Sequence, residues 1–274
     1  MSGLTNLPPL RDSLTEHGLL ANKGFGQHFL LDLNITRKIA RLAGLQPGDR
    51  VIEIGPGPGG LTRALLEIGA QVIAVEMDKR FEPLLSELAL AADGALTTLF
   101  ADALTVDEAA LADGHPTAIV ANLPYNVGTP LLIKWLTGPF TATSLTLMFQ
   151  KEVAERIVAA PGSDAYGRLA VITQATAQAR IVMDLPARAF TPPPKVASAV
   201  VHLTPLADRP DPILLDALQK VTAAAFGQRR KMLRSSLKTL GGEALCTIAG
   251  ISPDVRAETI DVAGFLALAR ASLN

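Results

Sequence analysis

The sequence is most informative between residues 50 and 60, which read Arg50-Val-Ile-Glu-Ile-Gly-Pro-Gly-Pro-Gly-Gly60. The first five residues are typical of a short buried strand, and the run that follows is typical of a glycine-rich turn. Residues 61–68 (LTRALLEI) then continue as a helix. Because glycine lacks a Cβ atom, a ligand can approach the backbone of such a turn closely. The segment therefore predicts a strand, a ligand-binding turn and a helix, in that order.

The same strand-then-helix order continues along the chain. Further strands are expected at residues 71–76, 96–100, 117–121 and 145–150, and helices at residues 80–92 and 130–136. Nearly continuous apolar strands that alternate with helices are typical of parallel sheets covered on both faces. We therefore expect an α/β fold with a doubly wound, mostly parallel sheet of the Rossmann-like type.

The pattern changes after residue 150. Helices are expected at residues 151–159 and 167–178, and late strands at residues 180–184 and 198–204, with the proline run TPPP (191–194) as a turn or extended loop between them. Residues 206–212 (LADRPDP) resemble a linker, and residues 213–274 show helical periodicity only. The predicted organisation is an N-terminal tail (1–22), an α/β domain (23–205) and a small all-helical C-terminal domain (206–274).

Composition excludes several classes of protein. The 274 residues are 49% hydrophobic with a net charge of −1, which supports a folded core and excludes a globally basic nucleic-acid binder. The charge is uneven, since residues 1–150 carry −5 and residues 151–274 carry +4. The single cysteine excludes an internal disulfide framework, and the four histidines match no metal-ligand spacing. Without a signal peptide or membrane-length apolar run, we expect a soluble, cytoplasmic protein with no metal and no membrane partner.

The glycines and two glutamates indicate the kind of ligand. Gly55, Gly57 and Gly60 satisfy G-x-G-x-x-G, and Glu76 ends the next strand where a ribose-binding acid is expected. These residues alone fit either a nicotinamide dinucleotide or S-adenosylmethionine (SAM). Glu53 favours SAM, because a carboxylate is repelled by a pyrophosphate but is attracted to an ammonium and a sulfonium.

The E-x-G-x-G-x-G form, together with Glu76, resembles the class I SAM-dependent methyltransferases. That resemblance implies that Glu76 accepts hydrogen bonds from both ribose hydroxyls and that Met77 packs on the adenine of the cofactor. It also implies that Asp102, with Ala103 beside it, binds the adenine amino group. Gly55 and Gly57 would let the cofactor approach the protein backbone closely.

Asn122-Leu-Pro-Tyr125 follows the predicted strand 117–121, at the sheet edge where ligands of open α/β folds bind. The exocyclic amine of adenine is a poor nucleophile, because its lone pair is delocalised into the ring. The Asn122 side-chain oxygen and the Leu123 carbonyl can accept its hydrogens and so orient the lone pair. Pro124 fixes the turn, and Tyr125 can stack on a flipped base.

The longer segment Asn122-Leu-Pro-Tyr-Asn-Val-Gly-Thr-Pro-Leu-Leu132 resembles the adenine-N6 dimethyltransferases of ribosomal RNA, and more closely their small-subunit (16S) branch. Other segments agree with that branch. They are Lys23-Gly-Phe-Gly-Gln-His-Phe-Leu30, Phe149-Gln-Lys-Glu-Val-Ala-Glu-Arg-Ile157, Tyr166-Gly-Arg-Leu169, Phe190-Thr-Pro-Pro-Pro-Lys-Val-Ala-Ser-Ala-Val200 and Ala225-Phe-Gly-Gln-Arg-Arg-Lys231.

The resemblance implies roles for single residues. Tyr125 and Phe190 would sandwich the target adenine, while Asn122 and the Leu123 carbonyl hold N6. The cofactor-binding set adds three N-terminal residues, of which His28 is given no chemistry of its own: Gln27, His28 and Leu30. The reaction would be dimethylation of two adjacent adenosines in a hairpin near the 3′ end of 16S rRNA, during assembly of the small ribosomal subunit.

Cations gather near the motif at 225–231. Arg229, Arg230, Lys231 and Arg234 are predicted to contact RNA phosphates, and Lys195 in the proline loop is predicted to steer the RNA backbone. The partner would be 16S rRNA or the assembling small subunit, with the protein acting as a monomer.

Three other functions compete with this one. A 23S rRNA adenine dimethyltransferase of the macrolide-resistance type shares the chemistry, but the sequence of residues 122–132 and 226–231 favours the 16S branch. A catalytically idle ribosome-assembly factor is disfavoured, because Glu53, Glu76 and Asn122 are all present. A nicotinamide oxidoreductase function does not explain the motif Asn122-Leu-Pro-Tyr125.

Overall fold

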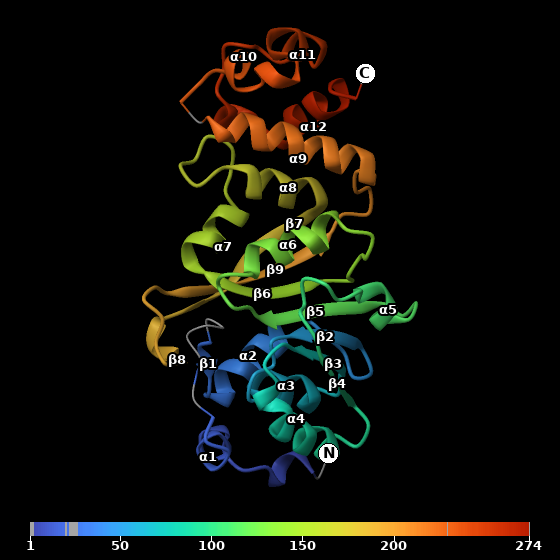
Figure 1. Cartoon of the computed structure of the whole chain (residues 1–274), viewed down its shortest axis with the longest axis vertical. Coiled ribbons are helices and arrows are strands. Elements are labelled where there is room, and N and C mark those ends of the chain that lie inside the picture. The colour runs from blue at the N-terminus through green and yellow to red at the C-terminus, as the bar shows by residue number, and fades with distance from the viewer. Residues whose placement is uncertain (1–2, 20, 22–26, 229, 274) are drawn as a thin grey trace. The chain divides into compact units, whose positions relative to one another are not determined.

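A computed structural model describes residues 3–19, 21, 27–228 and 230–273 of the chain (Figure 1). The chain forms two compact units. The sheet unit comprises the residues up to 132 with 140–154 and 181–204, and the helical unit comprises 133–139, 155–180 and the residues from 205 onward. The expected division after residue 205 had placed 133–139 and 155–180 in the first domain. Residues 155–180 belong with the later helices because Tyr166, Val171 and Ala175 share one apolar core with Leu218 and Phe265.

The main sheet has seven strands in the order β4-β3-β2-β5-β6-β9-β7. The first five strands of this order run parallel, and β9 runs antiparallel to β6. The strands are β2 (Arg50–Ile54), β3 (Gln71–Glu76), β4 (Leu96–Phe100), β5 (Thr117–Asn122), β6 (Leu145–Gln150), β7 (Ala177–Leu185) and β9 (Ser198–Pro205). The prediction of a doubly wound, mostly parallel sheet is confirmed.

The apolar strands are buried on both faces. Val51, Val72 and Val120 point into a core that they share with α2 and α3, whereas Ile52 and Ile119 are completely buried within the same strands. Successive side chains of a strand point to opposite faces, so a strand covered on both sides shows no polar alternation. This is why a continuous apolar run was the correct signal for β2 and β5.

Helices cover the sheet and connect its strands. In the sheet unit they are η1 (Leu4–Asn6), α1 (Leu10–Glu16), α2 (Leu33–Leu42), α3 (Gly60–Glu67), η3 (Lys79–Phe81), α4 (Glu82–Ala91), α5 (Glu108–Ala112) and η4 (Ala187–Ala189). Two helices, α6 (Gly128–Thr137) and α7 (Lys151–Ile157), begin in the sheet unit and end in the helical unit.

The N-terminal segment, read from sequence only as a tail, contributes to the sheet unit. Leu14 of α1 and Leu19 pack in an apolar cluster with Phe29, Phe81 and Leu85. Further along, β1 (Phe29–Leu30) pairs antiparallel with β8 (Phe190–Thr191) in a separate two-stranded sheet. Residues 23–26, the start of one resemblance motif, lie outside the described residues.

The helical unit has its own core. Its helices are α8 (Arg168–Thr176), α9 (Pro212–Gly227), α10 (Leu233–Ser236), η5 (Lys238–Leu240), α11 (Gly242–Ile248), η6 (Ala257–Thr259) and α12 (Val262–Ala271). Phe226 stacks on Phe265 and meets Tyr166 edge-on, and the buried Cys246 lies in the same core. The predicted helical character of the C-terminal part is confirmed.

The strand order predicts where a ligand binds. β2 lies between β3 and β5, so the chain leaves β2 toward one edge of the sheet and returns on its other side. In open α/β sheets the crevice at such a reversal, beyond the carboxyl ends of the strands, is the usual ligand site.

Candidate active site

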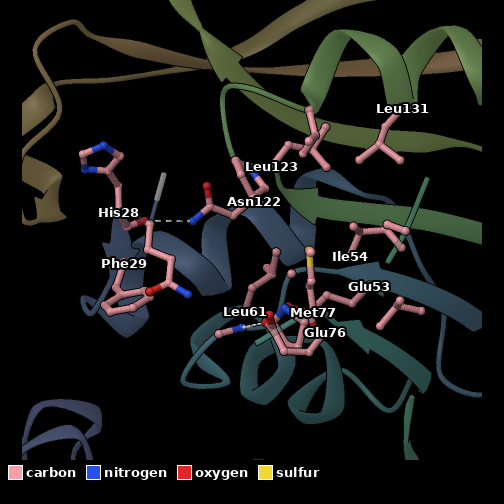
Figure 2. A pocket seen from close by; sticks show the side chains of 18 of the residues that line it. His28, Phe29, Glu53, Ile54, Leu61, Glu76, Met77, Asn122, Leu123 and Leu131 are labelled. Atoms are coloured by element: carbon pink, nitrogen blue, oxygen red, sulfur yellow. Dashed lines mark hydrogen bonds between the residues drawn. The ribbon is translucent and has the colours of Figure 1, made fainter. Parts of the chain in front are cut away.

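A cavity of about 330 Å³ lies beyond the carboxyl ends of β2, β3 and β5. Its size is in the range of pockets that hold small ligands. Figure 2 shows it between the Glu53–Glu76 side and the His28–Asn122 side. All of the residues predicted to bind cofactor or to form the Asn122 turn line it: Gln27, His28, Leu30, Glu53, Gly55, Gly57, Glu76, Met77, Asp102, Ala103, Asn122, Leu123, Pro124 and Tyr125. The sequence therefore located the pocket, although the roles of these residues toward a ligand stay predictions.

The glycine-rich turn is held in place by the next strand. Gly57 has φ +53°, in the left-handed region that favours glycine, and its N–H donates to the Glu76 carboxylate at 2.9 Å. Gly60 begins α3 directly beside β1, where a Cβ atom would lie only 2.8 Å from the Leu30 carbonyl oxygen. The glycines thus allow both the turn and the close approach of the N-terminal strand.

Glu76 is oriented by backbone donors. One carboxylate oxygen accepts from Gly57 N–H, and the other accepts from Asp78 N–H at 2.8 Å. Burial raises the pKa of Glu76, and these two N–H groups oppose that rise. Each oxygen keeps a second lone pair that can accept a hydrogen bond from a ligand hydroxyl.

Glu53 is a buried carboxyl group with one oxygen that lacks a hydrogen-bond partner. Its side chain is 1% exposed, and Oε2 has no hydrogen-bond partner among the described residues. Burial raises the pKa of Glu53 to about 8, nearby Glu76 adds to the rise, and the Thr62 hydroxyl acts in the opposite direction. A buried acceptor without a partner is costly unless a ligand supplies one. A cationic ligand would satisfy Glu53 and favour its ionised form.

The far end of the cavity combines an acid with exposed apolar side chains. Asp102 Oδ1 accepts from Leu104 N–H at 2.9 Å, which orients the carboxylate in the loop after β4. Met77 is 58% exposed and Leu104 is 41% exposed, although both are large apolar residues. Such surfaces, next to one polar group, suit a flat heterocycle with an amino substituent.

The orientation of Asn122 follows from its neighbour. Asn122 Nδ2 donates to the backbone carbonyl of His28 at 3.4 Å, and Figure 2 shows this bond as a dashed line. A carbonyl oxygen can only accept, so the nitrogen of the Asn122 amide must face it. The side-chain oxygen of Asn122 is thereby turned away from the His28 carbonyl, and its predicted role as the acceptor for a ligand amine stays a prediction.

Tyr125 has one contact at its hydroxyl and another on a face of its ring. Its hydroxyl lies 2.7 Å from the hydroxyl of Ser198, and the His28 ring stacks on it with centroids 5.6 Å apart and planes 29° apart. Burial raises the pKa of Tyr125, so the phenol stays neutral. The contact of Ser198 with Tyr125 could not be predicted from the sequence, because nothing in an apolar strand indicates which side chain its serine will meet.

Phe190 does not line the cavity, and its role toward an adenine stays a prediction. Its ring is 2% exposed, belongs to the apolar core with Leu30 and Val200, and is absent from the cavity lining. The physical reason is the antiparallel pairing of β8 with β1, in which Leu30 is opposite Phe190. In this structure Phe190 therefore does not form the second aromatic face of the site that was expected opposite Tyr125.

A polar network missed from the sequence joins the N-terminal segment to Glu76. Gln27 Nε2 donates to the nearly buried Asp78 carboxylate at 2.8 Å, and Arg80 Nη2 pairs with the same carboxylate at 2.6 Å. The Arg80 guanidinium lowers the pKa of Asp78. Since Asp78 N–H also donates to Glu76, Gln27 is linked through one residue to the acid predicted to bind the ribose.

Four of the predicted RNA-contacting cations lie among the described residues, and all four are exposed. Lys195 lies in the loop after β8 of the sheet unit, and Arg230 and Lys231 lie between α9 and α10 of the helical unit. Arg234 is exposed but pairs with Asp254 at 2.6 Å, so part of its charge is already balanced. Arg229 lies outside the described residues.

The described residues also bear on metal binding and on membrane insertion. No group of three or more His, Cys, Asp or Glu side chains there could hold a metal ion. Within the same residues, no helix combines the length and apolarity that crossing a bilayer requires.

Comparison with known proteins gives consistent results. A family model described as ribosomal RNA adenine dimethylase matches residues 18–272. The chain is 74% identical to a protein of Phenylobacterium zucineum, over 98% of this chain and 94% of that one. It is 69% identical to a protein of Caulobacter vibrioides, over 93% of this chain and 98% of that one. Both relatives are named ribosomal RNA small subunit methyltransferase A.

Solved structures resemble this one at lower identity. A dimethyladenosine transferase from Plasmodium falciparum is 27% identical with a TM-score of 0.73, covering 88% of this chain and 96% of that one. A 23S rRNA methyltransferase, ErmE, is 26% identical with a TM-score of 0.67, covering 90% of this chain and all of that one.

Proposed function

The chain belongs to the ribosomal RNA adenine dimethylase family, and on that premise we propose that it methylates N6 of two adjacent adenosines in a hairpin near the 3′ end of 16S rRNA. The methyl donor is SAM and the product is N6,N6-dimethyladenosine, formed during assembly of the small ribosomal subunit. The substrate places the activity in the cytoplasm.

The observation that carries this proposal is the match to relatives named for the small subunit. They are 74% and 69% identical over nearly the whole chain, whereas ErmE, named for 23S rRNA, is 26% identical. The 16S substrate is therefore favoured over the 23S substrate. A nicotinamide oxidoreductase is incompatible with the family.

The cofactor half of the cavity fits SAM. Bound SAM supplies a methyl group activated by the positive charge of its sulfonium. Glu53 Oε2 offers a buried acceptor for a cationic group, and Glu76 offers lone pairs for the ribose hydroxyls. Asp102 and the exposed Met77 line the same cavity and would bind the adenine. These are three separate complementarities to one molecule.

The acceptor half of the cavity fits an adenine. The Asn122 side-chain oxygen and the Leu123 carbonyl accept the two N6 hydrogens, which directs the nitrogen lone pair away from the ring and into the cavity. Tyr125 supplies an aromatic surface for the base. The chain mainly provides proximity and orientation, which can contribute a large share of a rate enhancement. The proton released from N6 passes to water, so no general base is required.

The remaining parts of the proposal concern RNA and assembly state. Exposed Arg230 and Lys231 would bind phosphates, because cations on a surface replace the counterions of RNA. The proposal keeps a monomer as the acting form of the protein. An idle assembly factor is disfavoured, because Glu53, Glu76 and Asn122 line a preformed cavity.

The proposal is tested with a short RNA carrying the 3′-terminal hairpin and with SAM binding measured separately by calorimetry. We expect SAM to bind the protein alone and methyl groups to accumulate on N6 of adjacent adenosines, either in the hairpin or in the small subunit that contains it. Binding of SAM without transfer to any small-subunit RNA would favour the assembly-factor function instead.

A further inference from the structure

His28 contacts three parts of the proposed acceptor site. Its backbone carbonyl accepts from Asn122 Nδ2 at 3.4 Å, and its ring Nδ1 lies 2.8 Å from the carbonyl oxygen of Pro192 in the proline loop. Its ring also stacks on Tyr125, with centroids 5.6 Å apart. Figure 2 shows the His28 backbone carbonyl bonded to the Asn122 amide. No other described residue is bonded to Asn122, stacked on Tyr125 and linked to Pro192.

The chemistry of these contacts defines the state of the ring. Because the Pro192 carbonyl can only accept, Nδ1 of His28 carries a hydrogen and donates it. That bond sets the plane of the imidazole, and the plane of the imidazole supports one face of the Tyr125 ring. At its other end Tyr125 is bonded to Ser198. The orientation of Tyr125 is thus fixed by His28 and Ser198 together.

The backbone contact has a separate consequence. With Nδ2 held by the His28 carbonyl, the Asn122 oxygen has a defined direction. An acceptor amine must be held twice, first with two hydrogens and then with one hydrogen and one methyl group. The second transfer tolerates less error, because the monomethylated nitrogen keeps only one hydrogen to bond to Asn122 or Leu123.

We propose that His28 is a positioning residue of the acceptor-base site, which aligns Tyr125 and Asn122 for the second methyl transfer. This inference rests on the proposed function. It assigns to the His28 ring a role toward the RNA base, beyond the cofactor contact predicted from its place in the sequence. Its largest effect should therefore fall on conversion of N6-monomethyladenosine to N6,N6-dimethyladenosine.

Two variants separate the contacts of the ring. His28→Ala removes the stacking on Tyr125 and the bond to Pro192, whereas His28→Phe keeps a stacking ring and loses only the bond. His115→Ala is the matched control, since His115 is exposed and lies outside the cavity lining. For each protein, the SAM Kd, the kcat and KM for RNA, and the ratio of monomethylated to dimethylated adenosine are measured.

We expect His28→Ala to lower kcat/KM for RNA about tenfold, the scale of one lost hydrogen bond. Monomethyladenosine should accumulate, while the SAM Kd stays within about twofold of wild type. His28→Phe should accumulate less monomethyladenosine than His28→Ala. A SAM Kd that weakens by the same factor as kcat/KM, at an unchanged product ratio, would show that His28 serves only the cofactor. Unchanged kinetics would equally overturn the proposal.

A readout without RNA distinguishes failure of this inference from failure of the proposed function. The chain has two tyrosines, Tyr125 and Tyr166, so ring-labelled tyrosine gives two assignable sets of NMR signals. Loss of the stacked imidazole in His28→Ala should shift the Tyr125 signals and leave those of Tyr166 unchanged. An unmoved Tyr125 signal would contradict the positioning role. If wild-type protein methylated no RNA while Tyr125 shifted, the proposed function would fail and the contact itself would stand.

Discussion

The hydroxyl of Tyr125 lies 2.7 Å from the hydroxyl of Ser198, and this bond joins the loop after β5 to strand β9. Ser198 is completely buried, 73 residues further along the chain. β9 thus does more than extend the sheet, because it supplies the group that anchors the aromatic side chain of the proposed acceptor site. The antiparallel pairing of β9 with β6 places Ser198 opposite Gln150, one residue before the first helix that follows β6.

Removing this bond should slow catalysis without unfolding the protein. Ser198→Ala and Tyr125→Phe each remove one hydroxyl, and a single hydrogen bond contributes about 0.5–1.5 kcal/mol. We expect each variant to lower kcat by about two- to tenfold at an unchanged SAM Kd. The double variant should be no worse than either single one, because both lose the same bond. Additive losses in the double-mutant cycle would refute a shared role.

Asn122 should be essential for transfer but not for RNA binding. Asn122→Ala removes the side-chain oxygen that holds N6, and loss of one preorganised polar group in an active site costs about 10²–10³-fold in rate. We expect methylation to fall at least that far, with RNA affinity nearly unchanged in a filter-binding assay. Normal turnover by this variant would remove Asn122 from the mechanism.

The affinity for SAM should rise with pH, and Glu53 should be the reason. Burial raises the pKa of Glu53 to about 8, so below that pH the carboxyl is protonated in the ligand-free protein. Pairing with a cationic ligand requires Glu53 to release this proton. The release weakens SAM affinity below pH 8, whereas above pH 8 the carboxyl is already ionised. The expected gain approaches tenfold per pH unit between pH 6 and 8 and then levels off.

Glu53→Gln provides the control for that prediction. The amide keeps the shape of the side chain but cannot ionise, so calorimetric SAM affinity should be weaker at pH 8 and should depend less on pH. If wild type and Glu53→Gln gave parallel pH profiles, the titrating group would lie elsewhere.

The cations at residues 229–231 should control RNA affinity through charge. Replacing Arg229, Arg230 and Lys231 with Ala should weaken RNA binding and reduce the slope of log K against log salt, by about 0.7 for each lost phosphate contact with single-stranded RNA. A control with equal charge replaces Lys220, Arg256 and Arg270, which are exposed in the same unit. An identical salt slope in both triple variants would exclude residues 229–231 from the RNA interface.

The parts of the structure that depend on residues adjacent in the sequence could be predicted. Strand β2, the glycine turn and helix α3 form one continuous segment, and their apolar pattern and glycines contain the needed information. The end of β3 at Glu76 followed in the same way. The sheet order then brought these segments to one cavity, because the carboxyl ends of parallel strands share an edge.

The contacts that could not be predicted join residues far apart in sequence. Gln27 binds Asp78 across 51 positions, and Tyr125 binds Ser198 across 73. The burial of Phe190 could not be predicted for the same reason, since it depends on pairing between β8 and the distant β1. Local patterns carry no information about which loop side chains meet. The N-terminal α1 was missed because its apolar residues are few and pack against η3 and α4.

The most direct test of the account is methyl transfer from labelled SAM to undermodified small ribosomal subunits and, separately, to large-subunit RNA. Both RNAs are digested and analysed by mass spectrometry for N6,N6-dimethyladenosine. The account predicts this nucleoside in small-subunit RNA alone, with two dimethylated adenosines adjacent in sequence. Product only in large-subunit RNA would keep the chemistry and overturn the substrate, and absence of product from both would contradict the proposed function itself.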